Sequence, residues 1–101
     1  MQRRRESRYE VWESVVLRIL DHWEPTHSAA TVVDISHAGY RVLATKEVAA
    51  GTEVLITLNS VAIIGRVRHC EKAQEDSFTV GVEITDVVGG VAEAAARCHV
   101  N

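Results

Sequence analysis

The chain has 101 residues, which is enough for one domain but too few for separate receptor and output units. It is 47% hydrophobic and 25% charged, an ordinary composition for a soluble globular domain, and this excludes a chain that is disordered at rest. The apolar runs fall far short of the roughly 20 residues that cross a bilayer, and no continuous apolar segment follows the basic N-terminus. We therefore expect a cytoplasmic protein with neither a membrane span nor a secretory signal.

The chain begins with a basic segment, and we predict that residues 1–10 form a mobile arm before a single domain of residues 11–101. Four of the 11 lysines and arginines lie within the first eight positions, although the formal net charge is -3. Two of them, Arg4 and Arg8, form an RxxxR pattern, and Arg3 directly precedes it. A basic end on an acidic chain favours a receptor for a small anion over a general binder of polyanions.

Six segments after the arm have the two-residue alternation or the β-branched content of half-buried strands. In chain order they are residues 15–20, 29–34, 40–44, 54–58, 61–69 and 78–84. The connections between them are short and contain turn residues, at 36–39, 49–52, 59–60 and 71–77. Short connections favour antiparallel neighbours.

Six antiparallel strands in so small a chain are expected to curl into a compact β-barrel, because closure removes the exposed edges of an open sheet. Gly65 and Gly81 lie inside strand patterns and are candidate bend positions. The alanine-rich segment 91–98 predicts one short helix over a barrel opening. The predicted fold class is therefore all-β, a six-stranded antiparallel β-barrel with a short C-terminal helix.

A second polar motif lies where the second predicted strand turns into the third, at residues 34–39 with the sequence DISHAG. By itself, such a motif is typical of a side-chain-capped turn that glycine closes. A basic N-terminal run by itself is likewise typical of a solvated tail. Neither motif alone predicts a function. Together they do, because they occur in a particular order and spacing within one pattern of alternating strands.

That order and spacing resemble the signature of a known family, the PilZ domains. The RxxxR of Arg4 and Arg8 is followed, one strand later, by a DxSxxG formed by Asp34, Ser36 and Gly39. The resemblance covers nearly the whole chain, because the predicted strands and terminal helix are also similar to the family fold.

Membership of this family would imply a receptor for the bacterial second messenger cyclic di-GMP, built on a split barrel. Segment 79–84 resembles the closing barrel strand of the family. The resemblance implies these ligand-binding residues: Arg3, Arg4, Arg8, Asp34, Ser36 and Gly39. In the family, an arginine directly before RxxxR accompanies a stacked pair of ligand molecules, so Arg3 predicts that binding mode.

The arginines suit this ligand, which has two phosphodiester charges and two guanines. A guanidinium group can form two hydrogen bonds with the O6 and N7 edge of guanine, pair with phosphate or stack on a purine. By similarity to the family, Arg4 and Arg8 would hold guanine and phosphate, and Arg3 would add a further contact.

The second motif supplies acceptors and a tight turn. We expect Asp34 to accept hydrogen bonds from N1 and N2 of guanine, and Ser36 to donate to phosphate or to cap the turn. Gly39 permits a positive φ and lets the ligand approach the backbone without a Cβ in the way. Tyr40 and Arg41 follow closely and are further candidates for ligand contact.

The sequence predicts neither a metal site nor a cofactor. Cys70 and Cys98 form no CxxC pattern, and the five histidines are scattered. An enzyme is also not expected, because Asp34, Ser36 and His37 lie too close along one turn to act as separate nucleophile, base and orienting group.

Two other binding functions compete with the receptor. The chain could be a degenerate PilZ-like module that acts only through protein contacts, although all the signature residues are present. A barrel that binds single-stranded nucleic acid is disfavoured by the acidic net charge and the low aromatic content of 5%. We expect Trp12 and Trp23 to pack in the core or at a barrel end rather than to stack on bases.

The expected signal is a change in the arm. Ligand binding would order the arm over the barrel mouth, and a separate downstream protein would recognise the new surface. Fixing each residue costs about 1–2 kcal/mol of backbone entropy, which charge-assisted contacts of about 1.5–3 kcal/mol each can exceed.

Overall fold

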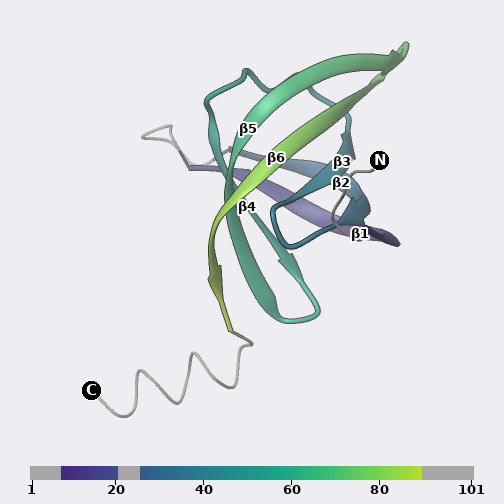
Figure 1. Ribbon diagram of the computed structural model, residues 1–101. Helices are drawn as coiled ribbons and strands as arrows, with labels where there is room; N and C mark the ends of the chain where they lie inside the picture. Colours follow the sequence, from purple (N-terminus) through teal and green to yellow (C-terminus); the bar gives the residue numbers. More distant parts are fainter. Residues whose placement is uncertain (1–7, 21–25, 90–101) are drawn as a thin grey trace, which may run out of the picture.

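The computed structural model describes residues 8–20 and 26–89, and every regular element in them is a β-strand (Figure 1). The strands are β1 (Tyr9–Ile19), β2 (Thr26–Ile35), β3 (Gly39–Ala44), β4 (Glu53–Leu58), β5 (Val61–Gln74) and β6 (Ser77–Val88). The prediction of six antiparallel strands is confirmed. Within these residues there is no helix with the length and apolar content to cross a bilayer. The helix predicted at residues 91–98 lies outside the described residues.

The strands follow the order β1-β2-β3-β6-β5-β4, and β4 pairs back with β1, so the sheet closes into a barrel. The closing contact is short, because the register partners of β1 and β4 are only Arg18 with Leu55 and Ile19 with Val54. On its other edge β1 pairs with β2 from Tyr9 to Ile19, apart from the register shift between Glu10 and Glu13. In the described part of the chain, the barrel is therefore joined at one end of β1 and open beside the other.

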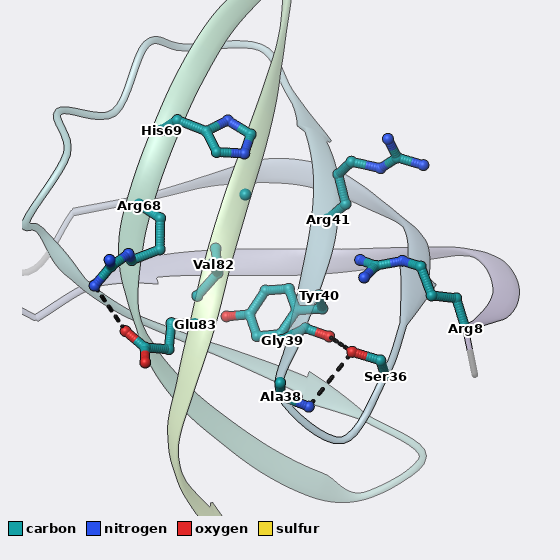
Figure 2. A pocket seen from close by; sticks show the side chains of 11 residues that line it. Arg8, Ser36, Ala38, Gly39, Tyr40, Arg41, Arg68, His69, Val82 and Glu83 are labelled. Atoms are coloured by element: carbon teal, nitrogen blue, oxygen red, sulfur yellow. Dashed lines mark hydrogen bonds and ion pairs between the residues drawn. The ribbon is translucent and has the colours of Figure 1, made fainter. Parts of the chain in front are cut away.

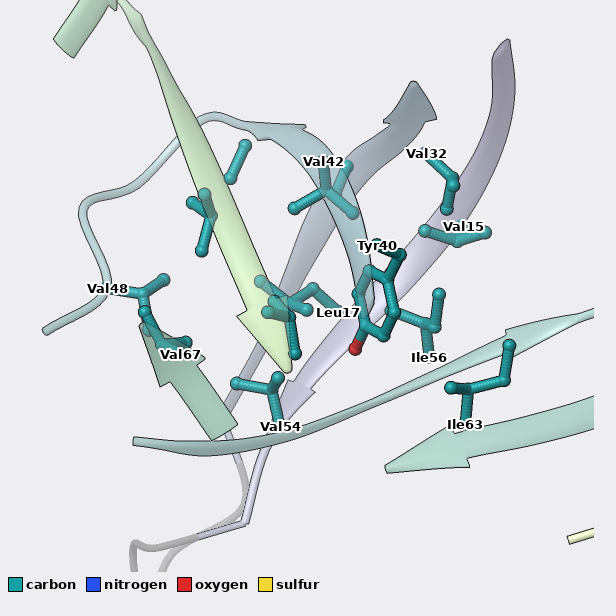
Figure 3. Packing of buried hydrophobic residues seen from close by; sticks show 14 of the residues in the cluster. Val15, Leu17, Val32, Tyr40, Val42, Val48, Val54, Ile56, Ile63 and Val67 are labelled. Atoms are coloured by element: carbon teal, nitrogen blue, oxygen red, sulfur yellow. The ribbon is translucent and has the colours of Figure 1, made fainter. Parts of the chain in front are cut away.

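The core lies inside the barrel because alternate residues of each strand face inward (Figure 3). The largest fully buried side chains are Leu17, Val32, Tyr40, Val42, Val54, Ile56, Val67 and Val80. Full burial of one such side chain stabilises the fold by about 1.5–3 kcal/mol. The Tyr40 hydroxyl is buried without a hydrogen-bond partner among the described residues, and burial raises its pKa, so this phenol stays neutral.

The hairpin of β5 and β6 is longer than the sequence predicts. Residues 71–77 were expected to be a connection, but β5 continues to Gln74, β6 begins at Ser77, and residues 75–76 form the turn. The side chains of residues 71–76 are exposed, so they show no alternation between core and solvent. Pairing between the two backbones holds this extension together, as in the register of Glu71 with Thr79.

Strand β1 also begins earlier than predicted, at Tyr9, which lies within the expected arm of residues 1–10. A register shift between Glu10 and Glu13 interrupts its pairing with β2, and Trp12 adopts a φ of 52° there. Trp12 is 58% exposed, so the prediction that it packs in the core or at a barrel end was wrong. Trp23 lies outside the described residues.

Candidate ligand-binding site

A pocket of about 430 Å³ lies on the surface over β3, β6 and β5 (Figure 2). Arg8 and Arg41 stand on one side of it, and Arg68 and Glu83 stand on the other. The turn between β2 and β3 closes the end nearest Arg8. The pocket lies where both polar motifs of the sequence meet, because Arg8 belongs to the first and the turn to the second.

The register of the strands explains why residues far apart in sequence share this pocket. Asp34 of β2 pairs with Arg41 of β3, Arg41 pairs with Gly81 of β6, and Gly81 pairs with His69 of β5. Directly paired residues of antiparallel strands have Cα atoms about 4.5–5.5 Å apart, so this row crosses four strands within a short distance. A Cβ on Gly81 would lie 2.5 Å from Nε2 of His69, which shows that the imidazole rests on this glycine.

Asp34 is buried between two arginines. Its residue surface is only 4% exposed. Arg8 donates to Oδ1 from Nη2 at 2.8 Å and from Nε at 3.2 Å. Arg41 donates to Oδ2 from Nε at 3.1 Å and also from Nη2. The two guanidinium groups thus use different oxygens of one carboxylate.

The pKa of Asp34 results from two opposing effects. Burial raises the pKa, but the hydrogen bonds and positive charges of Arg8 and Arg41 more than offset burial, so the pKa lies below the ordinary value of 3.8. Asp34 is therefore a carboxylate at neutral pH, and its charge is matched inside the cluster.

This lowered pKa predicts a pH-dependent contribution to stability. A carboxyl whose pKa is lower in the folded state stabilises the fold fully above its unfolded pKa, and the contribution is lost as the pH falls through the folded pKa. We expect Asp34→Asn to lower the free energy of unfolding by about 1–3 kcal/mol at pH 7. The difference from wild type should shrink below about pH 4, as measured by chemical denaturation over a pH series.

Glu83→Gln provides the control for this prediction. Glu83 accepts from Nη1 of Arg68 at 2.9 Å, but both side chains are more than half exposed, at 52% and 64%. Such a surface ion pair contributes about 0–1 kcal/mol, so this variant should stay close to wild type. A stability difference for Asp34→Asn that does not change with pH would contradict the assignment of the lowered pKa.

The hydroxyl of Ser36 is used within the turn. Ser36 is 5% exposed. Its Oγ donates to the carbonyl oxygen of Gly39 at 3.3 Å and accepts from the backbone N–H of Ala38 at 3.4 Å. The backbone N–H of Ser36 also donates to the same carbonyl at 2.8 Å. Of the two roles expected for Ser36, the free protein shows the capping of the turn.

The positive φ that glycine permits is not used at Gly39, because Gly51 is the one glycine with a positive φ among the described residues. A Cβ on Gly39 would instead lie 2.4 Å from the carbonyl oxygen of Val82. The missing side chain therefore allows the turn to pack directly on β6.

The structure thus brings four of the six predicted site residues together. Arg8, Ser36 and Gly39 line the pocket, and Asp34 holds the arginine at its edge. Arg3 and Arg4 lie outside the described residues. Arg41, which was a secondary candidate, also lines the pocket.

Sequence reasoning missed the contributions of β5 and β6, namely His69, Gly81 and Glu83. Gly81 and Glu83 directly follow the buried valines Val80 and Val82, whereas His69 lies two residues after the buried Val67, across a register shift between β5 and β6. This pattern indicates an outward position for Gly81 and Glu83, but only the pairing of β5 with β6 and of β6 with β3 places them beside the two motifs.

The pocket has the chemistry of a site for an anion with planar groups. Its three arginines face two carboxylates, Asp34 and Glu83, which leaves one net positive charge when His69 is neutral. Guanidinium groups recognise phosphate and planar acceptor edges. The described residues contain no group of three or more His, Cys, Asp or Glu side chains that could hold a metal ion.

Residues 2–98 match the sequence model of the PilZ domain family. The match spans all six strands and the segments on both sides of them, so it covers almost the whole chain. No curated protein matches the chain.

Proposed function

The chain belongs to the PilZ domain family, and we propose on this basis that it is a receptor for cyclic di-GMP. Domains of this family are binding domains rather than enzymes, and they serve in general as receptors for this dinucleotide. The observation that carries the proposal is the meeting of Arg8 with the turn of residues 36–39 at one pocket. These two elements contain the two motifs that the family uses for its ligand.

The size and charge of the pocket support a nucleotide ligand. Its volume of about 430 Å³ lies within the roughly 300–1,000 Å³ that is usual for small-molecule sites. Arg8, Arg41 and Arg68 present guanidinium groups from three separate parts of the chain. A ligand with two phosphodiesters and two guanines offers each of them an acceptor that can form two hydrogen bonds.

We assign the ligand contacts as the motifs suggest. Arg8, with Arg4 and Arg3 from the basic segment, holds guanine and phosphate. Asp34 accepts from N1 and N2 of guanine, while Ser36 and Gly39 shape the turn on which the ligand rests. The ordered N-terminal segment and the ligand together form the surface that a downstream protein recognises, and Arg3 favours a stacked pair of ligand molecules.

Calorimetric titration of the full chain with cyclic di-GMP tests the proposal. We expect measurable binding heat at micromolar protein and low salt. The affinity should fall as salt is added, because exposed charges are screened within about 10 Å at 0.1 M ionic strength. Absence of heat at low salt would overturn the proposal.

A protein-interaction module without nucleotide binding is the second candidate. The observation that favours it is the exposure of two large aromatic side chains of β1, Tyr9 at 67% and Trp12 at 58%. Large apolar side chains left exposed are candidate contacts for a partner protein. If the titration shows no binding heat while a partner protein is captured through Tyr9 and Trp12, this function replaces the receptor.

A further inference from the structure

The acceptor capacity of Asp34 is used up in the free protein. An ionised carboxylate offers about four acceptor positions. Arg8 supplies two N–H donors to Oδ1, and Arg41 supplies two to Oδ2. A guanine can therefore bind Asp34 only after one of the two arginines has left it.

The two arginines are held differently, although their side chains are equally exposed at 47%. Arg41 lies inside β3, with register partners in both neighbouring strands, Asp34 of β2 and Gly81 of β6. Arg8 directly precedes Tyr9, the first residue of β1, which pairs with β2. The backbone of Arg41 is thus fixed from both sides, so Arg8 is the arginine that can leave.

We propose that Arg41 is a positioning residue of the ligand site, which holds Asp34 through Oδ2 while Arg8 exchanges Oδ1 for the ligand. This inference rests on the proposed function. The exchange conserves hydrogen bonds, because Oδ1 loses two N–H donors of Arg8 and gains the N1–H and N2–H donors of one guanine. The released Arg8 is then available for phosphate or for the O6 and N7 edge of guanine.

Burial explains why Arg41 must stay. After the exchange, Arg41 is the one cation among the described residues that still contacts the carboxylate of Asp34. The charged groups that contact the carboxylate of Asp34 are Arg8 and Arg41. The register partner of Asp34 on β1 is Glu10, and the turn that follows β2 contains the titratable His37. Without Arg41, burial would favour the protonated acid, which accepts fewer hydrogen bonds from guanine.

The test compares Arg41→Ala with Arg68→Ala in the full chain. Both variants remove one positive charge from the same pocket, but Arg68 pairs with Glu83 rather than with Asp34. Cyclic di-GMP is titrated into each protein from pH 8 to pH 4. We expect Arg68→Ala to bind more weakly than wild type, with the same dependence of affinity on pH. Arg41→Ala should weaken binding at least about tenfold more at pH 7, and its loss of affinity in acid should begin at least about 1 pH unit higher.

The outcomes separate this inference from the proposed function. One outcome is that wild type binds and that Arg41→Ala and Arg68→Ala have the same affinity and the same pH profile as each other. This outcome would overturn the role of Arg41 but leave the proposed function standing. Absence of binding by wild type would overturn the proposed function and this inference with it. If circular dichroism shows that Arg41→Ala is unfolded, Arg41→Lys and Arg68→Lys repeat the comparison. Lysine keeps the charge and loses the planar fork, so a greater loss of affinity is expected for Arg41→Lys, and an equal loss would overturn the inference.

Discussion

Replacing Arg8 with alanine is expected to weaken the binding of cyclic di-GMP by a factor of about 100 or more. Arg8 is the second arginine of the RxxxR motif and lies within the residues that the structure describes. It lines the pocket beside the turn of the second motif. The loss of two charge-assisted contacts, each worth about 1.5–3 kcal/mol, gives a change of this size. Titration calorimetry of wild type and variant measures it directly.

The same substitution should cost the free protein only about 1 kcal/mol, because Arg8 is the exposed partner of the buried Asp34 and solvent screens its charge. Arg8 is 47% exposed, and Arg41 still pairs with Asp34 when Arg8 is absent. Arg18→Ala is the matched control, since Arg18 is an exposed arginine near the other end of β1 and does not line this pocket. Equal affinities of wild type and Arg8→Ala would refute the assigned contact.

Gly39→Ala is expected to lower the free energy of unfolding by about 2–3 kcal/mol, because it forces a side chain into a packed site. The new Cβ would lie 2.4 Å from the carbonyl oxygen of Val82, a backbone atom inside the pairing of β3 with β6. The strands would have to separate or the turn would have to shift, so binding of cyclic di-GMP should weaken as well. Chemical denaturation and ligand titration of the variant measure the two effects.

Gly81→Ala is the matched control on the same pocket floor. A Cβ there would also come within 2.5 Å of another atom, but that atom is Nε2 of His69. His69 is exposed and can rotate away, whereas the carbonyl of Val82 is fixed in the sheet. Gly81→Ala should therefore stay closer to wild type in stability than Gly39→Ala. The reverse order would show that the contact with the carbonyl of Val82 is not what destabilises Gly39→Ala.

The strand content of this protein could be predicted because alternation is a local property. Val80 and Val82 point inward while Gly81 and Glu83 point outward, and a period of two reveals this from neighbouring residues. The prediction failed where strands carry no buried face. Residues 71–74 are exposed, so backbone pairing alone makes them part of β5.

The order of the two motifs in the sequence predicted which residues would meet, and Arg8 does contact Asp34 across a separation of 26 positions. The functions of individual residues were less accessible. Ser36 was correctly considered as a turn cap, but the reason for Gly39 was a clash with β6 rather than a positive φ. Steric requirements of this kind depend on an atom more than 40 residues away, and no local pattern encodes them.

By itself, the sequence determined the six strands, the face of each that is buried, and the placing of an arginine motif one strand before an acid-serine-glycine turn. Only the tertiary structure decided that Arg41 shares Asp34 with Arg8 and that His69 and Glu83 complete the same pocket. The physical reason is that these neighbours are set by cross-strand register. Register depends on how the inward side chains of all six strands pack together in one closed barrel.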